Sequence, residues 1–180
     1  MGVKVVLATG IGEEAARKIG LDTGILKPEH ESVCGSVISG RDLQKIYNGQ
    51  PTSLNYDITP EYLSVVYGAT KQNRETLIDF LAKSHPGRSG VMSQNGFGSE
   101  DFKTAPPVAT VGAIGSGDND VLMLRKAAVS FSTNQRVQSD SRYSADMILI
   151  NDDLQDVVRA IVKGRAYKDN LMKFLLLQIP

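Results

Sequence analysis

The sequence predicts an α/β fold in which parallel, Rossmann-like strands alternate with helices. Short apolar runs recur along the 180 residues, and a stretch with helical spacing follows most of them. Several runs are continuous rather than alternating, which is typical of strands buried on both faces of a sheet. Such an order predicts a parallel sheet flanked by helices, with ligands expected at the carboxyl ends of the strands.

The first half of the chain predicts two strand–helix units. Residues 3–9 (VKVVLAT) form an apolar run bounded by Gly10, and residues 13–20 (EEAARKIG) follow with Glu13 and Glu14 in the first turn, where carboxylates suit the helix dipole. The other elements predicted here are a strand within 62–70, a helix at 72–84, and one short helix at 40–46 inside an otherwise irregular segment, 26–60.

The second half predicts three more strands and a helical C-terminus. Residues 85–107 are rich in Gly, Ser and Pro and predict an exposed insertion. Residues 108–114 (VATVGAI) predict a fully buried strand. The remaining elements are a helix at 120–127, strands at 128–131 and 147–150, and one or two helices over 153–179. We therefore expect one domain over 1–164 and a C-terminal amphipathic helix over 165–180.

Composition narrows the functional classes. Twenty basic and twenty acidic side chains give a formal charge of zero, which argues against a protein that binds nucleic acid by neutralising phosphates. Cys34 is the single cysteine, so no internal disulfide is possible, and we expect it to be a small packed side chain. No stretch reaches the ~18 apolar residues of a membrane span. These features predict an intracellular protein and leave the compartment, cytosol or organelle interior, open.

One loop carries the main chemical signal. Residues 113–127 (AIGSGDNDVLMLRKA) predict a strand, a glycine-rich acidic loop and a helix. In a site for phosphate and magnesium, a carboxylate is expected after the first glycine, but Ser116 stands there. Asn119 and Asp120 have two interpretations, ligands of a metal or caps of the following helix, and the capping role is favoured.

Four segments resemble the phosphorylation domain of P-type cation-transporting ATPases, in particular the plasma-membrane calcium pumps. They are residues 7–25 (LATGIGEEAARKIGLDTGI), 69–81 (ATKQNRETLIDFL), 113–127, and 143–178 (YSADMILINDDLQDVVRAIVKGRAYKDNLMKFLLLQ). The resemblance implies a haloacid-dehalogenase-like fold whose chemistry passes through an aspartyl phosphate.

The same resemblance implies that the chemistry is lost. The "DKTGT" segment that carries the nucleophile occurs nowhere in the chain, Ser116 replaces the magnesium carboxylate, Ile11 replaces the Asp of "TGD", and Arg74 replaces the phosphate-binding Lys. We therefore predict a pseudo-enzyme with no catalytic residue and no bound metal, in which magnesium and ATP binding have been lost. The remnants of the phosphate site are expected at Thr9, Gly10, Arg74, Ser116, Asn119 and Asp120. From its own context, Arg74 is interpreted as a solvated or ion-paired helix residue.

Two features predict a partner. The resemblance places the missing nucleophile strand in the middle of the sheet, so its loss leaves two unpaired inner edges, which another chain could fill, or a sheet that has closed up. An apolar stripe near the C-terminus either binds a partner or packs on its own domain; its residues are Leu171, Phe174, Leu175 and Leu177.

These observations predict a structural or interaction subunit of a larger assembly, with no nucleic-acid partner. A position next to a membrane complex is left open. Two other functions also stay open: one half of a split P-type ATPase or haloacid-dehalogenase-like phosphatase, whose nucleophile strand lies on another chain, and a phosphate- or nucleotide-sensing module that uses Thr9, Gly10 and Arg74.

Overall fold

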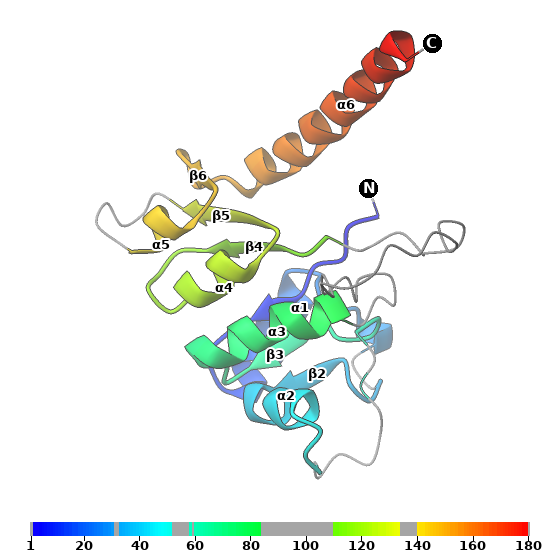
Figure 1. Cartoon of the computed structure of the whole chain (residues 1–180). Coiled ribbons are helices and arrows are strands. Elements are labelled where there is room, and N and C mark those ends of the chain that lie inside the picture. Colours follow the sequence, from blue (N-terminus) through cyan, green and yellow to red (C-terminus); the bar gives the residue numbers. More distant parts are fainter. Residues whose placement is uncertain are drawn as a thin grey trace, which may run out of the picture.

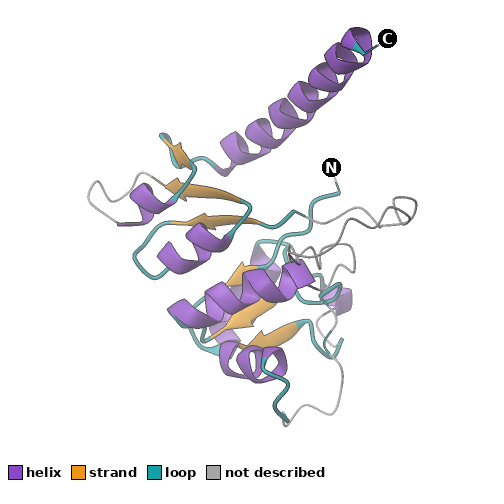
Figure 2. Ribbon diagram, in the orientation of Figure 1, coloured by secondary structure: helices purple, strands orange, loops and turns teal. Residues whose placement is uncertain are grey.

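The computed structural model describes residues 2–30, 33–51, 58, 60–83, 110–133 and 140–179. Within these ranges the strands are parallel and form two three-stranded sheets flanked by helices (Figure 1, Figure 2). The predicted α/β, Rossmann-like architecture is confirmed. The insertion predicted at 85–107 lies outside the described residues.

The first sheet has the strand order β1-β3-β2. Val65 of β3 is buried between Leu7 of β1 and Val37 of β2, its partners in register. The two faces are covered by separate apolar clusters, one built around Leu43 and the other around Ala16. The elements of this half are β1 (Leu7–Ala8), α1 (Glu13–Asp22), the 3₁₀ turn η1 (Pro28–His30), β2 (Val37–Ser39), α2 (Gly40–Tyr47), β3 (Val65–Tyr67) and α3 (Lys71–Lys83).

The second sheet has the strand order β4-β5-β6. Phe131 of β5 packs with Leu149 and Val157 on one face, while Ala113 packs with Leu124 on the other. The elements of this half are β4 (Gly112–Gly115), α4 (Val121–Lys126), β5 (Val129–Thr133), α5 (Asp140–Ser144), β6 (Met147–Leu149) and α6 (Leu154–Gln178).

Helices α3 and α4 pack against each other and join the two halves (Figure 1). Ile78 of α3 is buried in the cluster that holds Ala113, Met123 and Leu124. Lys126 of α4 forms ion pairs with two carboxylates of α3, at 3.3 Å from Glu75 and 2.9 Å from Asp79. We call this contact the α3–α4 seam.

Strands β1 and β4 each stand at the edge of their sheet, because the described strands are ordered β1-β3-β2 and β4-β5-β6. Of the two outcomes expected for a sheet without its middle strand, the described residues therefore show separate sheets and not a closed one.

Several elements differ in extent from the prediction. The first strand covers Leu7 and Ala8, and residues 2–6 before it are not in a strand. Strand β2 lies within the segment that was expected to hold only a helix. Strand β4 is not fully buried: Ala113 is buried but Ile114 is 44% exposed, because helices cover the Ala113 face and leave the other partly open. Cys34 is exposed, so its predicted packing is wrong.

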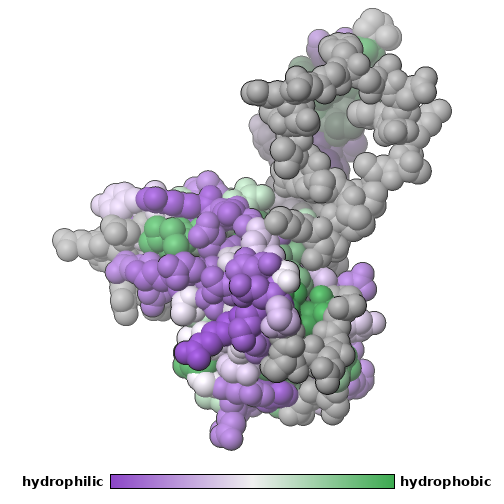
Figure 3. Space-filling view, turned by 60° about the horizontal axis from the view of Figure 1, so that its bottom comes forward, coloured by the Kyte–Doolittle hydropathy of each residue, from purple (hydrophilic) through white to green (hydrophobic). Residues whose placement is uncertain are grey.

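Helix α6 is one continuous helix, and Figure 1 shows it running outward from β6. Every described residue from 162 to 179 is exposed. The face of the molecule in Figure 3 is mainly hydrophilic, with apolar side chains in separate small areas. Among the described residues, no helix is both long enough and apolar enough to cross a membrane.

Candidate phosphate-site remnant

An ion pair between Arg74 and Asp120 lies at the centre of the candidate site. Arg74 is in the first turn of α3, and Asp120 immediately precedes α4. The Arg74 Nη1 donates to Asp120 Oδ1 across the α3–α4 seam. The two side chains are only 14% and 11% exposed, so solvent screens this pair weakly.

The second carboxylate oxygen of Asp120 is bound by the loop that precedes it. The backbone N–H groups of Ser116 and Gly117 donate to Asp120 Oδ2 at 3.0 and 3.3 Å. Gly115 is required for this arrangement, since a Cβ at that position would lie 2.5 Å from the Asp120 Cβ. The Asp120 side chain makes no capping hydrogen bond to α4, so the predicted capping role is wrong: the loop and Arg74 bind its oxygens instead.

The loop after β1 meets the same guanidinium. A Cβ added to Gly10 would lie 3.9 Å from Arg74 Nη2 and 3.7 Å from the Ala69 carbonyl oxygen. Thr9 begins this loop. Its backbone N–H donates to the Val66 carbonyl oxygen at 2.9 Å, and its Oγ1 accepts from the Ile11 N–H at 3.4 Å. The loop after β1 therefore lies beside the Arg74–Asp120 pair at the carboxyl end of β4.

An open pocket of about 370 Å³ lies over this loop. Its lining residues are Lys71, Arg74, Ser116, Gly117, Asp118, Asn119 and Asp120. Four of the six predicted remnants therefore line one pocket, and Gly10 lies beside the Arg74 that forms part of it. Its two cations, Lys71 and Arg74, are balanced by two carboxylates, Asp118 and Asp120. Asp120 already accepts from Arg74 and from the backbone N–H groups of Ser116 and Gly117.

Three further features bear on the electrostatics near the site: the Lys126 ion pairs, the buried Nε of Arg74 and the arrangement of possible metal ligands. The Asp79 carboxylate, followed by Glu75, raises the pKa of the Lys126 ammonium above its usual value. The Nε of Arg74 is buried and has no hydrogen-bond partner among the described residues. Within the same residues, no three His, Cys, Asp or Glu side chains are grouped so that they could hold a metal ion.

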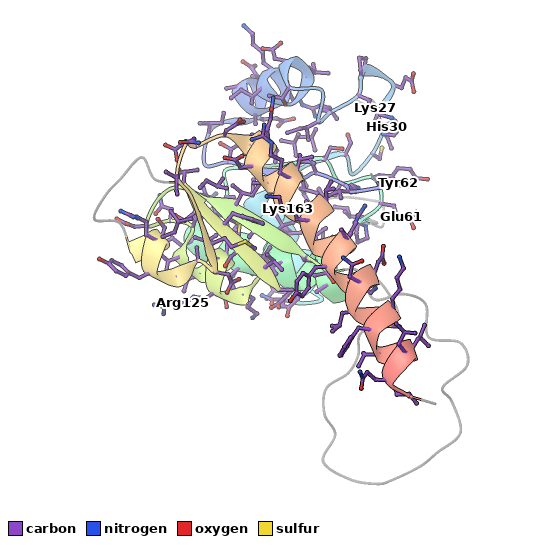
Figure 4. The ribbon with its side chains drawn as sticks, turned by 90° about the horizontal axis from the view of Figure 1, so that it is seen from above. Lys27, His30, Glu61, Tyr62, Arg125 and Lys163 are labelled. Atoms are coloured by element: carbon purple, nitrogen blue, oxygen red, sulfur yellow. The ribbon has the colours of Figure 1, made fainter. Side chains whose placement is uncertain are left out.

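The predicted partner stripe lies apart from this pocket. Leu171, Phe174, Leu175 and Leu177 are all exposed on the outer part of α6. Packing on their own domain was one of the two expected alternatives, and the described residues do not show it. Figure 4, seen from above, shows α6 extending past the body, with Lys163 labelled along it.

Three of the seven lining residues, Lys71, Gly117 and Asp118, were not among the predicted site residues. Lys71 lies three positions before Arg74 at the start of α3 and contributes a second cation to the pocket. A lysine one helical turn from a predicted phosphate-site arginine was the signal that pointed to it.

No protein-family model matches the chain. It is 26% identical over 178 residues to the human protein "Calcium-transporting ATPase type 2C member 1", and 27% identical over 178 residues to "Plasma membrane calcium-transporting ATPase 1" of Gallus gallus. The human "Plasma membrane calcium-transporting ATPase 3" is 26% identical over the same length. Each match covers 99% of this chain, but the chain spans only 13–16% of these relatives. Along nearly all of its length, this chain is therefore similar to one portion of the calcium-transporting P-type ATPases, and a relation to that group is supported.

Proposed function

We propose that this chain is a P-type ATPase-derived domain that does not transfer phosphate and serves as a structural or interaction subunit of a larger assembly. It binds neither magnesium nor ATP as a cofactor, and its partners are other protein subunits. The Arg74–Asp120 ion pair is the observation that carries this proposal.

Phosphoryl transfer depends on metal ions and free cationic groups that neutralise the transferring group. Here the Arg74 guanidinium is already paired with Asp120, and Asp120 also takes up the N–H groups of Ser116 and Gly117. Ser116 offers a neutral hydroxyl where a magnesium site would use a carboxylate. The residues that remain of the site stabilise the protein itself.

The test is incubation of the full chain with γ-labelled ATP and Mg²⁺, followed by acid quenching. We expect no labelled protein, while a calcium-transporting ATPase treated in parallel becomes labelled. An acid-stable label that hydroxylamine removes would show an acyl phosphate on this chain and would overturn the proposal.

A second candidate is one half of a split enzyme, and the edge positions of β1 and β4 favour it. Strands β1 and β4 are edge strands among the described residues, and the loops at their carboxyl ends lie beside the Arg74–Asp120 pair. Edge strands present unpaired N–H and C=O groups that can pair with an added strand. A strand supplied by another chain would carry the aspartate that this sequence lacks.

This candidate is tested by adding a peptide that contains the sequence DKTGT between two apolar flanks. Labelling of the peptide by ATP in the presence of the chain, and not of a peptide with Asn in place of the Asp, would favour the split enzyme. Peptide binding without labelling would leave the non-catalytic role in place.

A further inference from the structure

The exposed face of α6 continues the face by which this helix packs on its own sheet. Val157 and Ala160 contact the cluster built on Phe131 and Leu149. The residues that follow on that side, Gly164, Tyr167, Leu171 and Phe174, occur at alternating spacings of four and three residues after Ala160. We call these four residues the α6 stripe.

The α6 stripe is open to solvent. Tyr167, Leu171 and Phe174 are 76%, 50% and 56% exposed, and a Cβ added to Gly164 would have no atom within 4 Å. Alternating spacings of four and three keep side chains on one side of a helix, which is the pattern of a helix–helix seam. A glycine within the seam lets a second backbone approach closely.

The charges around the α6 stripe select its partner. Lys163 and Lys168 border the stripe on its two sides, because they lie next to Gly164 and Tyr167 in the sequence. From residue 162 to 179 there are four basic side chains, Lys163, Arg165, Lys168 and Lys173, and one acidic side chain, Asp169. A second copy of α6 would bring like charges together, which opposes pairing.

We propose that the α6 stripe binds one amphipathic helix of a partner protein, and that acidic side chains of that helix border its apolar seam and meet Lys163 and Lys168. This inference rests on the proposed role as an interaction subunit and names the kind of partner. An anionic lipid surface would also attract the bordering lysines, but it fits less well because Gly164 offers it no apolar side chain within the stripe.

The experiment measures binding of the full chain to two fluorescent helical peptides by anisotropy. The peptides share one leucine seam and differ only in their bordering residues, Glu in one and Lys in the other. We expect the Glu peptide to bind about tenfold more tightly. The double variant Lys163→Glu/Lys168→Glu should reverse this preference, an exchange that a purely apolar contact would not produce.

Two further variants locate the contact. The double variant Leu171→Ala/Phe174→Ala should lose binding of the Glu peptide, whereas Leu176→Ala should bind as the unmodified chain does, since Leu176 is 73% exposed but lies off the stripe. Circular dichroism of each variant checks that α6 is retained.

Three outcomes would overturn the inference. They are equal binding of both peptides, a concentration-dependent dimer by light scattering that excludes the peptide, and sedimentation with phosphatidylserine vesicles in the absence of peptide binding. Phosphorylation by ATP is measured separately, so a failure of peptide binding is distinguishable from a failure of the proposed non-catalytic role.

Discussion

The carboxylate of Asp120 takes up the hydrogen-bond donors of the candidate site. Its carboxylate accepts hydrogen bonds from Arg74, Ser116 and Gly117. These donors resemble those that hold an anionic ligand, since backbone N–H groups and a guanidinium are common anion binders. The residue that the sequence offered as a metal ligand instead completes an internal contact.

Removing the Arg74 guanidinium should therefore lower the free energy of unfolding. Arg74→Met leaves the Asp120 charge in a poorly solvated place, and breaking such a pair costs about 3–5 kcal/mol when it is fully buried. The matched change Arg159→Met, in an ion pair whose arginine is 64% exposed, should cost less than about 1 kcal/mol. Urea denaturation of both variants measures the difference. Similar losses for the two variants would show that the Arg74–Asp120 pair is not structural.

The glycines of the same loop give a second residue-scale prediction. Gly115→Ala places a Cβ 2.5 Å from that of Asp120 and should lower the free energy of unfolding by about 1–3 kcal/mol. Gly117→Ala is the control, because its Cβ would meet no atom within 4 Å. Thermal unfolding compares the two, and a Gly117→Ala loss as large as that of Gly115→Ala would contradict the close approach.

At this scale the sequence pointed to most of the site residues but not to their pairing. Arg74 and Asp120 were both expected near the remnant site, and an ion pair was among the interpretations of Arg74. The partner of Arg74 could not be named, because it lies 46 residues away and is brought close only by the packing of α3 on α4.

At the scale of elements, amphipathic helices were predictable and short strands were less so. Helix α3 was predicted at 72–84, and its residues Leu77, Phe80 and Leu81, which lie at helical spacing, all pack in one cluster. Strand β2 was missed because it spans only three residues and is flanked by turn residues. For β4, the sequence showed the apolar run but not which face a helix would cover.

The ion pairs between α3 and α4 predict a pH dependence. Because Asp79 and Glu75 raise the pKa of Lys126, the folded state binds this proton more tightly than the unfolded chain. The stabilisation is therefore full below about pH 10.5 and is lost as pH rises through the higher folded pKa. Its size should be less than about 1 kcal/mol, since the Lys126 side chain is 40% exposed.

Urea denaturation of the unmodified chain and of Lys126→Met checks this. The two free energies of unfolding should differ at about pH 7 and differ less at about pH 11, because the stabilisation falls once the pH exceeds the unfolded pKa of 10.5. Groups that titrate in both proteins, such as Tyr67, cancel in the comparison. A constant difference between the two pH values would mean that Lys126 acts through packing of its methylene chain.

For the whole molecule, the α3–α4 seam decides whether two small sheets behave as one unit. Each half has its own apolar clusters, and Ile78 is the α3 residue buried in a cluster of the second half. Ile78→Ala should lower the free energy of unfolding by about 2–4 kcal/mol and also weaken the coupling between the halves. Leu43→Ala, at a fully buried site within the first half, should cost a similar amount without uncoupling them.

Amide hydrogen exchange of β3 and β5 separates these effects. In the unmodified chain both strands should exchange through one common opening of the whole domain. In Ile78→Ala the β5 amides should exchange faster than those of β3, because the second half loses its main apolar contact with the first. Equal acceleration of both strands would show that the polar contacts of Arg74 and Lys126 suffice to keep the domain cooperative.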